Sequence, residues 1–455
     1  MELPLSQPLH PNSREGFSTC FSASKPPIIF IMKRLPVLGF LGISLANLTY
    51  GAISGLNAVP SLPENRSTNA SQLTEDSDFW GSFWNEAGGV TWKEFLLRAN
   101  LNYRGFYTDN SLIIPTTRKD DFMHYLSPQM DVTRAFESES HTTVVNIGYQ
   151  PTFVMSTYGN GTDRSYQQVR GSVAHSWGER RISLEHQYQQ SSEASTQVSY
   201  LAPQNSNLSR ASFETPISGK ISGSVGFEQN LTSSTPPETG LRQDLNSWIG
   251  SLAARYALLP KLTTGLGFSG GFSEQKSPTF QYSYLTEKLL SYWTYQLSGK
   301  VGMDLEFGGQ MSQSQVAGIR DPHTTPVFSM RMLYEPRYGT QVSVGAGTAV
   351  GASQFFNANY LTQSNVDLSV RQRIFESFAL IGRFGYIDGK YQSLQIGGAP
   401  LNRDFTGLSF STELEWRLNA RLRTSIFHQY LSRSSEYTRD SNSSNQIGLN
   451  CNFSL

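Results

Sequence analysis

The feature that constrains this chain most is an alternation of apolar and polar residues with a period of two, repeated from residue 95 to the C-terminus. In the last such segment Ile447, Leu449, Cys451, Phe453 and Leu455 share one parity, and polar residues or glycine occupy the other. Successive side chains of a strand point to opposite faces, so the pattern predicts strands with one apolar face. We count about 18 such segments of roughly 10 to 14 residues, enough for a tilted strand to cross a bilayer.

The connections between these segments alternate between short and long ones. Short connections fall at 177–180, 217–220, 258–261, 336–339, 375–377 and 418–421, and long polar ones are expected at 108–121, 191–207, 273–287, 314–325, 388–403 and 432–444. Outer-membrane barrels combine short periplasmic turns with long outer loops and an even number of strands. We therefore predict an all-β fold, a transmembrane antiparallel up-and-down β-barrel of about 18 strands, with 16 as the alternative.

Aromatic residues beside the short connections agree with a membrane boundary. Trp177, Tyr256, Tyr334, Phe375 and Trp416 all lie next to these connections. Tyrosine and tryptophan gather where hydrocarbon meets water, so we expect these residues to form an interfacial belt.

Composition excludes three other classes of protein. Aromatic residues make up 12% of the chain, and 36 Lys and Arg balance 36 Asp and Glu, whereas disordered chains have few aromatics and a large net charge. A bundle of membrane helices needs several apolar runs of about 20 residues, and only one such run is found, near the start. The lack of basic excess argues against a nucleic-acid partner.

The N-terminal part of the chain has the pattern of an exported protein. Met32-Lys33-Arg34 precedes an apolar run that ends at a small residue, Ala46. This pattern predicts that 1–51 is an upstream extension plus signal peptide, with translation starting at Met32; a membrane-anchoring helix is the alternative. Residues 52–94 are predicted to be a polar periplasmic linker with a short aromatic amphipathic segment, 79–84, and residues 95–455 to be the barrel.

The charged residues of the predicted strands occupy the parity opposite to the apolar residues. An arginine that points into hydrocarbon at the bilayer midplane costs about 2 to 4 kcal/mol, so this face must line a wet lumen. Solubilising the wall and tuning selectivity are both consistent with such a face. The expected lumen-lining residues are Arg98, Arg104, Asp131, Arg170, Glu185, Asp304, Glu306, Arg331, Asp367, Arg371, Arg383, Glu413, Glu415 and Arg417.

Residues 95–455 resemble the β-barrel porins of the "porin 2" type of Gram-negative bacteria. The resemblance rests on Asn102-Tyr103 followed by Thr108-Asp109-Asn110, on Asp120-Asp121, on Leu126-Ser127-Pro128 and on the run of alternating strands. It implies a barrel in the bacterial outer membrane, in contact with outer-membrane lipid and placed there by the barrel-insertion machinery. Outer-membrane barrels usually end in an aromatic residue, whereas this chain ends in Leu455, with Phe453 two places earlier.

The function expected from these features is passive diffusion of small polar solutes through a weakly charge-selective, porin-like channel. Two alternatives stay open: a closed or plugged barrel that serves surface-polysaccharide export or assembly, and an outer-membrane hydrolase. We expect no enzymatic activity, no cofactor and no metal site. The match of 265–270 to G-x-G-x-x-G is not followed by a helical pattern, and the histidines lack metal-ligand spacing.

Overall fold

The computed structural model describes residues 90–92, 94–110, 119–159, 163–191, 203–235, 240–278, 281–316, 319–352, 359–393, 404–435 and 441–454. The predicted signal peptide and the aromatic segment 79–84 lie outside the described residues. No helix in the described part of the chain is long and apolar enough to cross a membrane.

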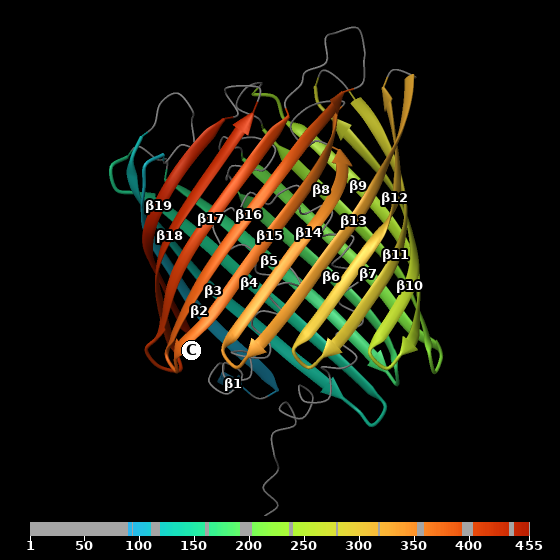
Figure 1. Ribbon diagram of the computed structural model, residues 1–455, viewed down its shortest axis with the longest axis horizontal. Helices are drawn as coiled ribbons and strands as arrows, with labels where there is room; N and C mark the ends of the chain where they lie inside the picture. Colours follow the sequence, from blue (N-terminus) through green and yellow to red (C-terminus); the bar gives the residue numbers. More distant parts are fainter. Residues whose placement is uncertain are drawn as a thin grey trace, which may run out of the picture. The chain divides into compact units, whose positions relative to one another are not determined.

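Eighteen strands, β2 to β19, form one closed antiparallel sheet (Figure 1). Each strand pairs with its neighbours in the sequence, and β19 pairs with β2 to close the barrel. This confirms the predicted all-β, up-and-down barrel of 18 strands. The strands are β2 Phe95–Thr108, β3 Asp121–Glu137, β4 His141–Ser156, β5 Arg164–Trp177, β6 Arg180–Ser191, β7 Gln204–Ser218, β8 Ile221–Ser234, β9 Gln243–Leu259, β10 Leu262–Lys276, β11 Gln281–Ser298, β12 Val301–Val316, β13 Ile319–Arg337, β14 Thr340–Ala352, β15 Asn359–Phe375, β16 Phe378–Ser393, β17 Phe405–Arg417, β18 Leu422–Ser435 and β19 Asn442–Ser454.

A short additional strand, β1 (Val90–Trp92), precedes the barrel. It pairs antiparallel with the first residues of β2, from Phe95 to Leu97. This strand falls within the range predicted to be a linker. Valine, threonine and tryptophan all favour extended structure, which accounts for a strand at this position.

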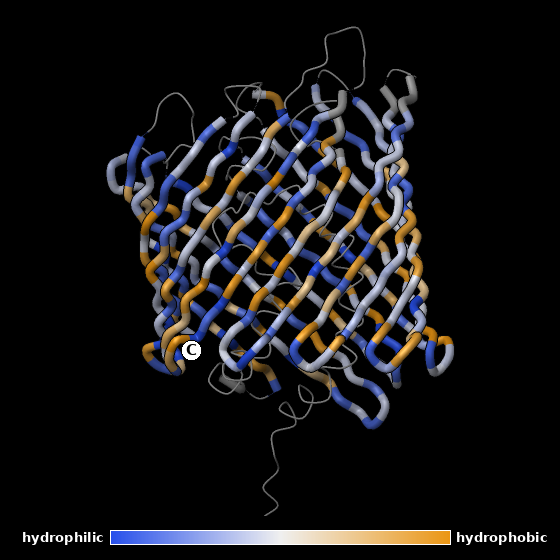
Figure 2. Tube along the Cα trace, viewed as in Figure 1, coloured by the Kyte–Doolittle hydropathy of each residue, from blue (hydrophilic) through white to orange (hydrophobic). Residues whose placement is uncertain are grey.

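The outer surface of the barrel is apolar. Ile147, Leu266, Leu289 and Ile426 each expose more than half of their surface, because they share the parity that points away from the barrel interior. Figure 2 shows apolar residues alternating with polar ones along the strands. Such a surface is solvated by hydrocarbon, and a closed barrel leaves no unpaired sheet edge in the lipid. The chain is therefore an outer-membrane β-barrel.

The aromatic belt predicted beside the short connections is present. Tyr256, Tyr334, Phe375 and Trp416 are exposed near the strand ends that meet at these connections, whereas the fifth predicted residue, Trp177, is half-buried and stacks on Phe213. Trp416 stacks on Phe378, with ring centroids 5.5 Å apart and the two planes at 7°. A belt at this level marks the boundary between hydrocarbon and water.

Two of the long connections predicted from the sequence were wrong. Strand β10 continues to Lys276 and β11 begins at Gln281; β12 continues to Val316 and β13 begins at Ile319. Strands reach 19 residues, longer than expected. Beyond the apolar band both faces of a strand meet water or polar groups, so the ladder continues there while the alternation of hydrophobicity disappears.

The closure between β19 and β2 yields a first prediction. A side chain at Gly448 would clash with the carbonyl oxygen of Gly105 and with Phe106, both on β2. We expect Gly448→Val to lower the free energy of unfolding by about 1 to 3 kcal/mol or more, because backbone has to move. Gly302 on β12 is the matched control, since no atom lies within 4 Å of the corresponding Cβ position. Urea unfolding of both valine variants in vesicles measures the difference, and equal stability would contradict the described register.

Candidate functional site

The inner face of the barrel carries the charged side chains. Leu414 and Trp416 of β17 are each 43% exposed on the outer surface, whereas Glu415 between them is 6% exposed and points inward. The neighbouring strand β16 alternates in the same way, with Leu380 and Phe384 exposed on the outer surface and Ile381 between them buried. The inner face is concave, so side chains from strands that are not adjacent converge on it.

One group of charges spans β15 to β18. Arg371 Nη2 lies 2.8 Å from Glu415 Oε1, although β16 runs between their strands. Arg423 Nη1 lies 3.4 Å from the other oxygen of Glu415. Ala379 and Ile381 of β16, both nearly fully buried, also point to this face. One carboxylate therefore compensates two guanidinium groups.

A second group adjoins the first. Arg383 Nη1 lies 3.1 Å from Glu413 Oε2, and the Ser425 hydroxyl donates a hydrogen bond of 2.6 Å to Glu413 Oε1. Asn450 donates in turn to the Ser425 hydroxyl at 3.2 Å. The network joins four consecutive strands, β16 to β19, on the inner face, and each carboxylate oxygen of Glu413 has a partner.

Ion pairs of the same kind occur on strands β3 to β8. Arg170 Nη2 lies 2.7 Å from Asp131 Oδ1, and the intervening strand β4 carries Gly148 at this position. Any side chain at Gly148 would clash with both partners, so glycine leaves the space for the pair. Arg210 lies between two carboxylates, 3.0 Å from Glu228 and 3.5 Å from Glu185.

The remaining predicted residues have varied surroundings. Asp304 accepts a hydrogen bond of 2.9 Å from Thr294, and Glu306 is buried at 5% exposure. The carboxylate of Asp367 lies over Gly345 of β14. The backbone register pairs Arg98 with Asp131, Arg331 with Asp304, and Arg417 with Arg423. The Arg417 and Arg423 pair thus places two like charges opposite each other near a short turn.

Arg104 is fully buried. Its Nη2 atom donates hydrogen bonds of 3.3 Å to Gln429 and to Gln446. Its guanidinium carbon lies 4.8 Å from the ring centre of Phe106 and 4.2 Å from that of Phe427. Such stacking on aromatic faces is favourable for a guanidinium group. Arg104 thereby links β2, β18 and β19, the strands around the closure.

The inner face is less polar than the sequence suggested. Inward-pointing apolar residues form a cluster that consists of Phe106, Met123, Tyr125, Val154, Tyr166 and Phe427. Most of them lie farther from the short turns than the ion pairs do. The sequence carried a signal for this cluster, because Phe106 has the parity of Arg98 and Arg104 and not that of Leu101.

Arg210 is an inner residue that the sequence prediction missed. Strand β7 alternates weakly, since its outward positions include Asn207 and Ser209 as well as Ala211 and Phe213. Its parity was therefore hard to assign from hydrophobicity. The charge pattern offered a better signal, because the hairpin partner strand carries Glu228 opposite Arg210.

Other motifs from the sequence have no site around them. The G-x-G-x-x-G match lies inside strand β10, with no helix after it. Within the described ranges, no three His, Cys, Asp or Glu side chains are placed to hold a metal ion. Cys451 is a free thiol, partly exposed, with the parity of the outward Leu449 and Phe453.

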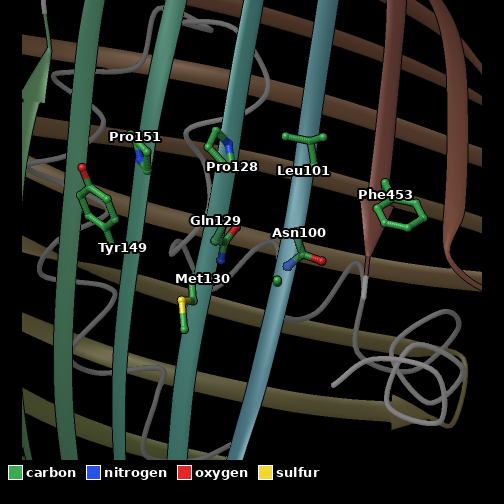
Figure 3. A pocket seen from close by; sticks show the side chains of 9 residues that line it. Asn100, Leu101, Pro128, Gln129, Met130, Tyr149, Pro151 and Phe453 are labelled. Atoms are coloured by element: carbon green, nitrogen blue, oxygen red, sulfur yellow. The ribbon is translucent and has the colours of Figure 1, made fainter. Parts of the chain in front are cut away.

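A hollow of about 400 Å³ lies on the outer surface at β2 to β4 and β19 (Figure 3). The β3–β4 ladder is interrupted between Leu126 and Met130. In this gap Pro128 of β3 lies opposite Pro151 of β4. Proline has no N–H for a ladder, which accounts for the interruption. The lining side chains Leu101, Met130 and Phe453 are exposed and apolar, so the hollow faces lipid.

No family model matches the chain, and no curated protein matches it. Among solved structures, the FrpB iron transporter from Neisseria meningitidis (F3-3 variant) is similar at 8% identity and a TM-score of 0.45; the match covers 74% of this chain and 62% of the transporter. Acinetobacter baumannii OccAB4 is similar at 7% identity and a TM-score of 0.44, with coverage of 79% and 98%. Pseudomonas aeruginosa OccK11 is similar at 11% identity and a TM-score of 0.41, with coverage of 79% and 96%.

Proposed function

We propose that the protein is an outer-membrane channel for passive diffusion of small polar solutes. The observation that carries this proposal is the network of cross-strand ion pairs on the inner face of a closed barrel whose outer face is apolar. Charged groups are stable on that face when water solvates them or when they are paired. A barrel of 16 to 18 strands is wide enough to hold an aqueous channel along its axis.

The proposed channel discriminates weakly between ions. The 14 side chains that we propose to line it comprise seven arginines and seven carboxylates. Most of the carboxylates lie within ion-pair distance of an arginine, so local potentials largely cancel. A wall of mixed sign lets both anions and cations pass, with a preference set by the few charges nearest the narrowest point.

Single-channel recording in a planar bilayer tests the proposed function. We expect purified protein to give steady conductance steps on the nanosiemens scale in potassium chloride, with a reversal potential close to zero under a salt gradient. Heat-denatured protein is the control for detergent artefacts. Silence from folded, inserted protein would contradict the proposal.

Silence would instead favour a barrel closed from within, serving surface-polysaccharide export or assembly. The inward apolar cluster around Phe106 is the observation in favour of that second function, because apolar side chains on an inner wall offer a surface for packing. Liposome swelling with small sugars separates the two, since only an open channel admits the sugar.

A further inference from the structure

The barrel wall is interrupted between β13 and β14. The two strands share seven register pairs, from Ser329 with Gly347 down to Arg337 with Thr340. Strands β12 and β13, by contrast, are paired along 16 positions. Beyond Ser329 and Gly347, and within the described residues, β13 is paired only with β12, and β14 only with β15. We refer to this stretch, 319–328 of β13 beside 348–352 of β14, as the seam (Figure 1).

The sequence of β13 encodes this interruption. The N–H of Glu335 donates to the carbonyl of Lys300, the residue just before β12, so odd-numbered residues of β13 bond β12 and even-numbered ones face β14. Continuing the register from Met330 with Ala346 would place Pro326 opposite Val350. Proline has no N–H, so it cannot donate to Val350. Pro322 of β13 is also even-numbered, so it too lacks an N–H on the side that faces β14.

A side chain replaces the missing backbone donor. The N–H of Arg373 donates to the carbonyl of Gly339, so the backbone groups of odd-numbered residues in β14 point toward β15. Those of even-numbered residues point toward β13, and the carbonyl of Val350 therefore faces the seam. That carbonyl accepts a hydrogen bond of 3.0 Å from Gln310 Nε2. Gln310 belongs to β12 and reaches past β13. The end of β14 is therefore held to the inner face of the neighbouring strands by a side chain.

Apolar packing closes the rest of the seam. Val350 belongs to a buried cluster with Tyr284 and Leu290 of β11 and Val327 of β13. These three partners point into the barrel. Ala349 of β14, which is paired with the inward Gln363, points into the barrel as well, so the next residue, Val350, lies on the outward face of β14. The outward face of β14 thus covers the inward face of β11 and β13. The two edges of the wall overlap at the seam.

We propose that the seam is a lateral gate, through which amphipathic molecules with a hydrocarbon portion move between the barrel interior and the membrane. Opening the wall elsewhere breaks a backbone hydrogen-bond ladder, whereas the seam opens by separating side-chain contacts, among them the hydrogen bond from Gln310 to Val350. The surfaces that separate are apolar, which suits a hydrocarbon chain and not an ion. Phe328, next to Val327, is 45% exposed on the outer surface, so the seam opens toward lipid.

A reversible lock tests the gate. Val327→Cys with Val350→Cys allows a disulfide across the seam, and the control pair Leu368→Cys with Phe384→Cys joins two strands whose ladder is intact. Outer-membrane vesicles with each protein are given a fluorescent fatty acid and, separately, sucrose. We expect oxidation of the seam pair to reduce fatty-acid uptake to the level of vesicles without the protein, reduction to restore it, and sucrose swelling to stay unchanged.

Two single substitutions provide an independent measurement. Pro326→Val supplies the missing N–H and is expected to slow fatty-acid uptake, whereas Gln310→Leu removes the bond to Val350 and is expected to accelerate it. Three results would overturn the gate. They are fatty-acid uptake that the seam lock does not change, uptake that the control lock reduces equally, and uptake no faster than in empty vesicles. Loss of sucrose swelling and conductance with seam-dependent fatty-acid uptake intact would instead overturn only the diffusion channel.

Discussion

Replacing Glu413 and Glu415 together by glutamine shifts the proposed channel toward anions. The two carboxylates compensate Arg383, Arg371 and Arg423, and their removal leaves three guanidinium groups on one part of the wall. At about 8 Å in water, one unit charge changes the energy of a monovalent ion by about 0.5 kcal/mol, which is about a twofold change in local concentration. The effect has opposite signs for chloride and potassium.

We therefore expect the chloride-to-potassium permeability ratio to rise about fourfold or more at low salt, and less at high salt because a Debye length of about 10 Å at 0.1 M screens the charges. The reversal potential under a salt gradient measures this ratio. Glutamine keeps the size and the hydrogen-bonding oxygen, so the barrel should remain folded. The matched variant Arg371→Gln with Arg383→Gln should move the ratio in the opposite direction. An unchanged ratio in a folded, conducting double variant would place the narrowest point elsewhere.

The fold was predictable because a membrane barrel repeats one simple rule. Along β17 and β19 the outward side chains meet lipid and are apolar, whereas the inward ones meet the barrel interior and are mostly polar. This alternation is visible in the sequence, so the number of strands and their two faces could be deduced from it. The rule fails where the lipid ends. The segments 273–287 and 314–325 were predicted to be long loops because their composition is polar, yet strands continue through most of them.

The pairing of charges depended on geometry that a sequence does not specify. Arg371 and Glu415 are 44 residues apart and reach across an intervening strand, and that contact depends on the register of three strands at once. Arg210 was missed because its strand alternates weakly. The seam had a visible signal in Pro322 and Pro326, but only the phase of the β12–β13 ladder shows that both prolines face β14.

The assignment of faces on which these proposals depend is tested most directly by Leu414→Arg. Leu414 is 43% exposed on the outer surface of β17, in register with the apolar residues Leu380 and Ile426 of the adjacent strands. An arginine there points into hydrocarbon two residues inside the belt residue Trp416, so the free energy of unfolding should fall by about 1 to 3 kcal/mol, between the costs at the interface and at the midplane.

Leu418→Arg is the matched control for depth. Leu418 is 42% exposed, but it lies beyond the belt residue Trp416, in the short turn between β17 and β18. Near the interface an arginine costs only about 0 to 1 kcal/mol, since the guanidinium reaches water and headgroups. Reversible urea unfolding in lipid vesicles, followed by tryptophan fluorescence, measures both variants. A harmless Leu414→Arg would mean that the inner and outer faces of β17 are exchanged, because a shift of one residue in a strand inverts every side chain.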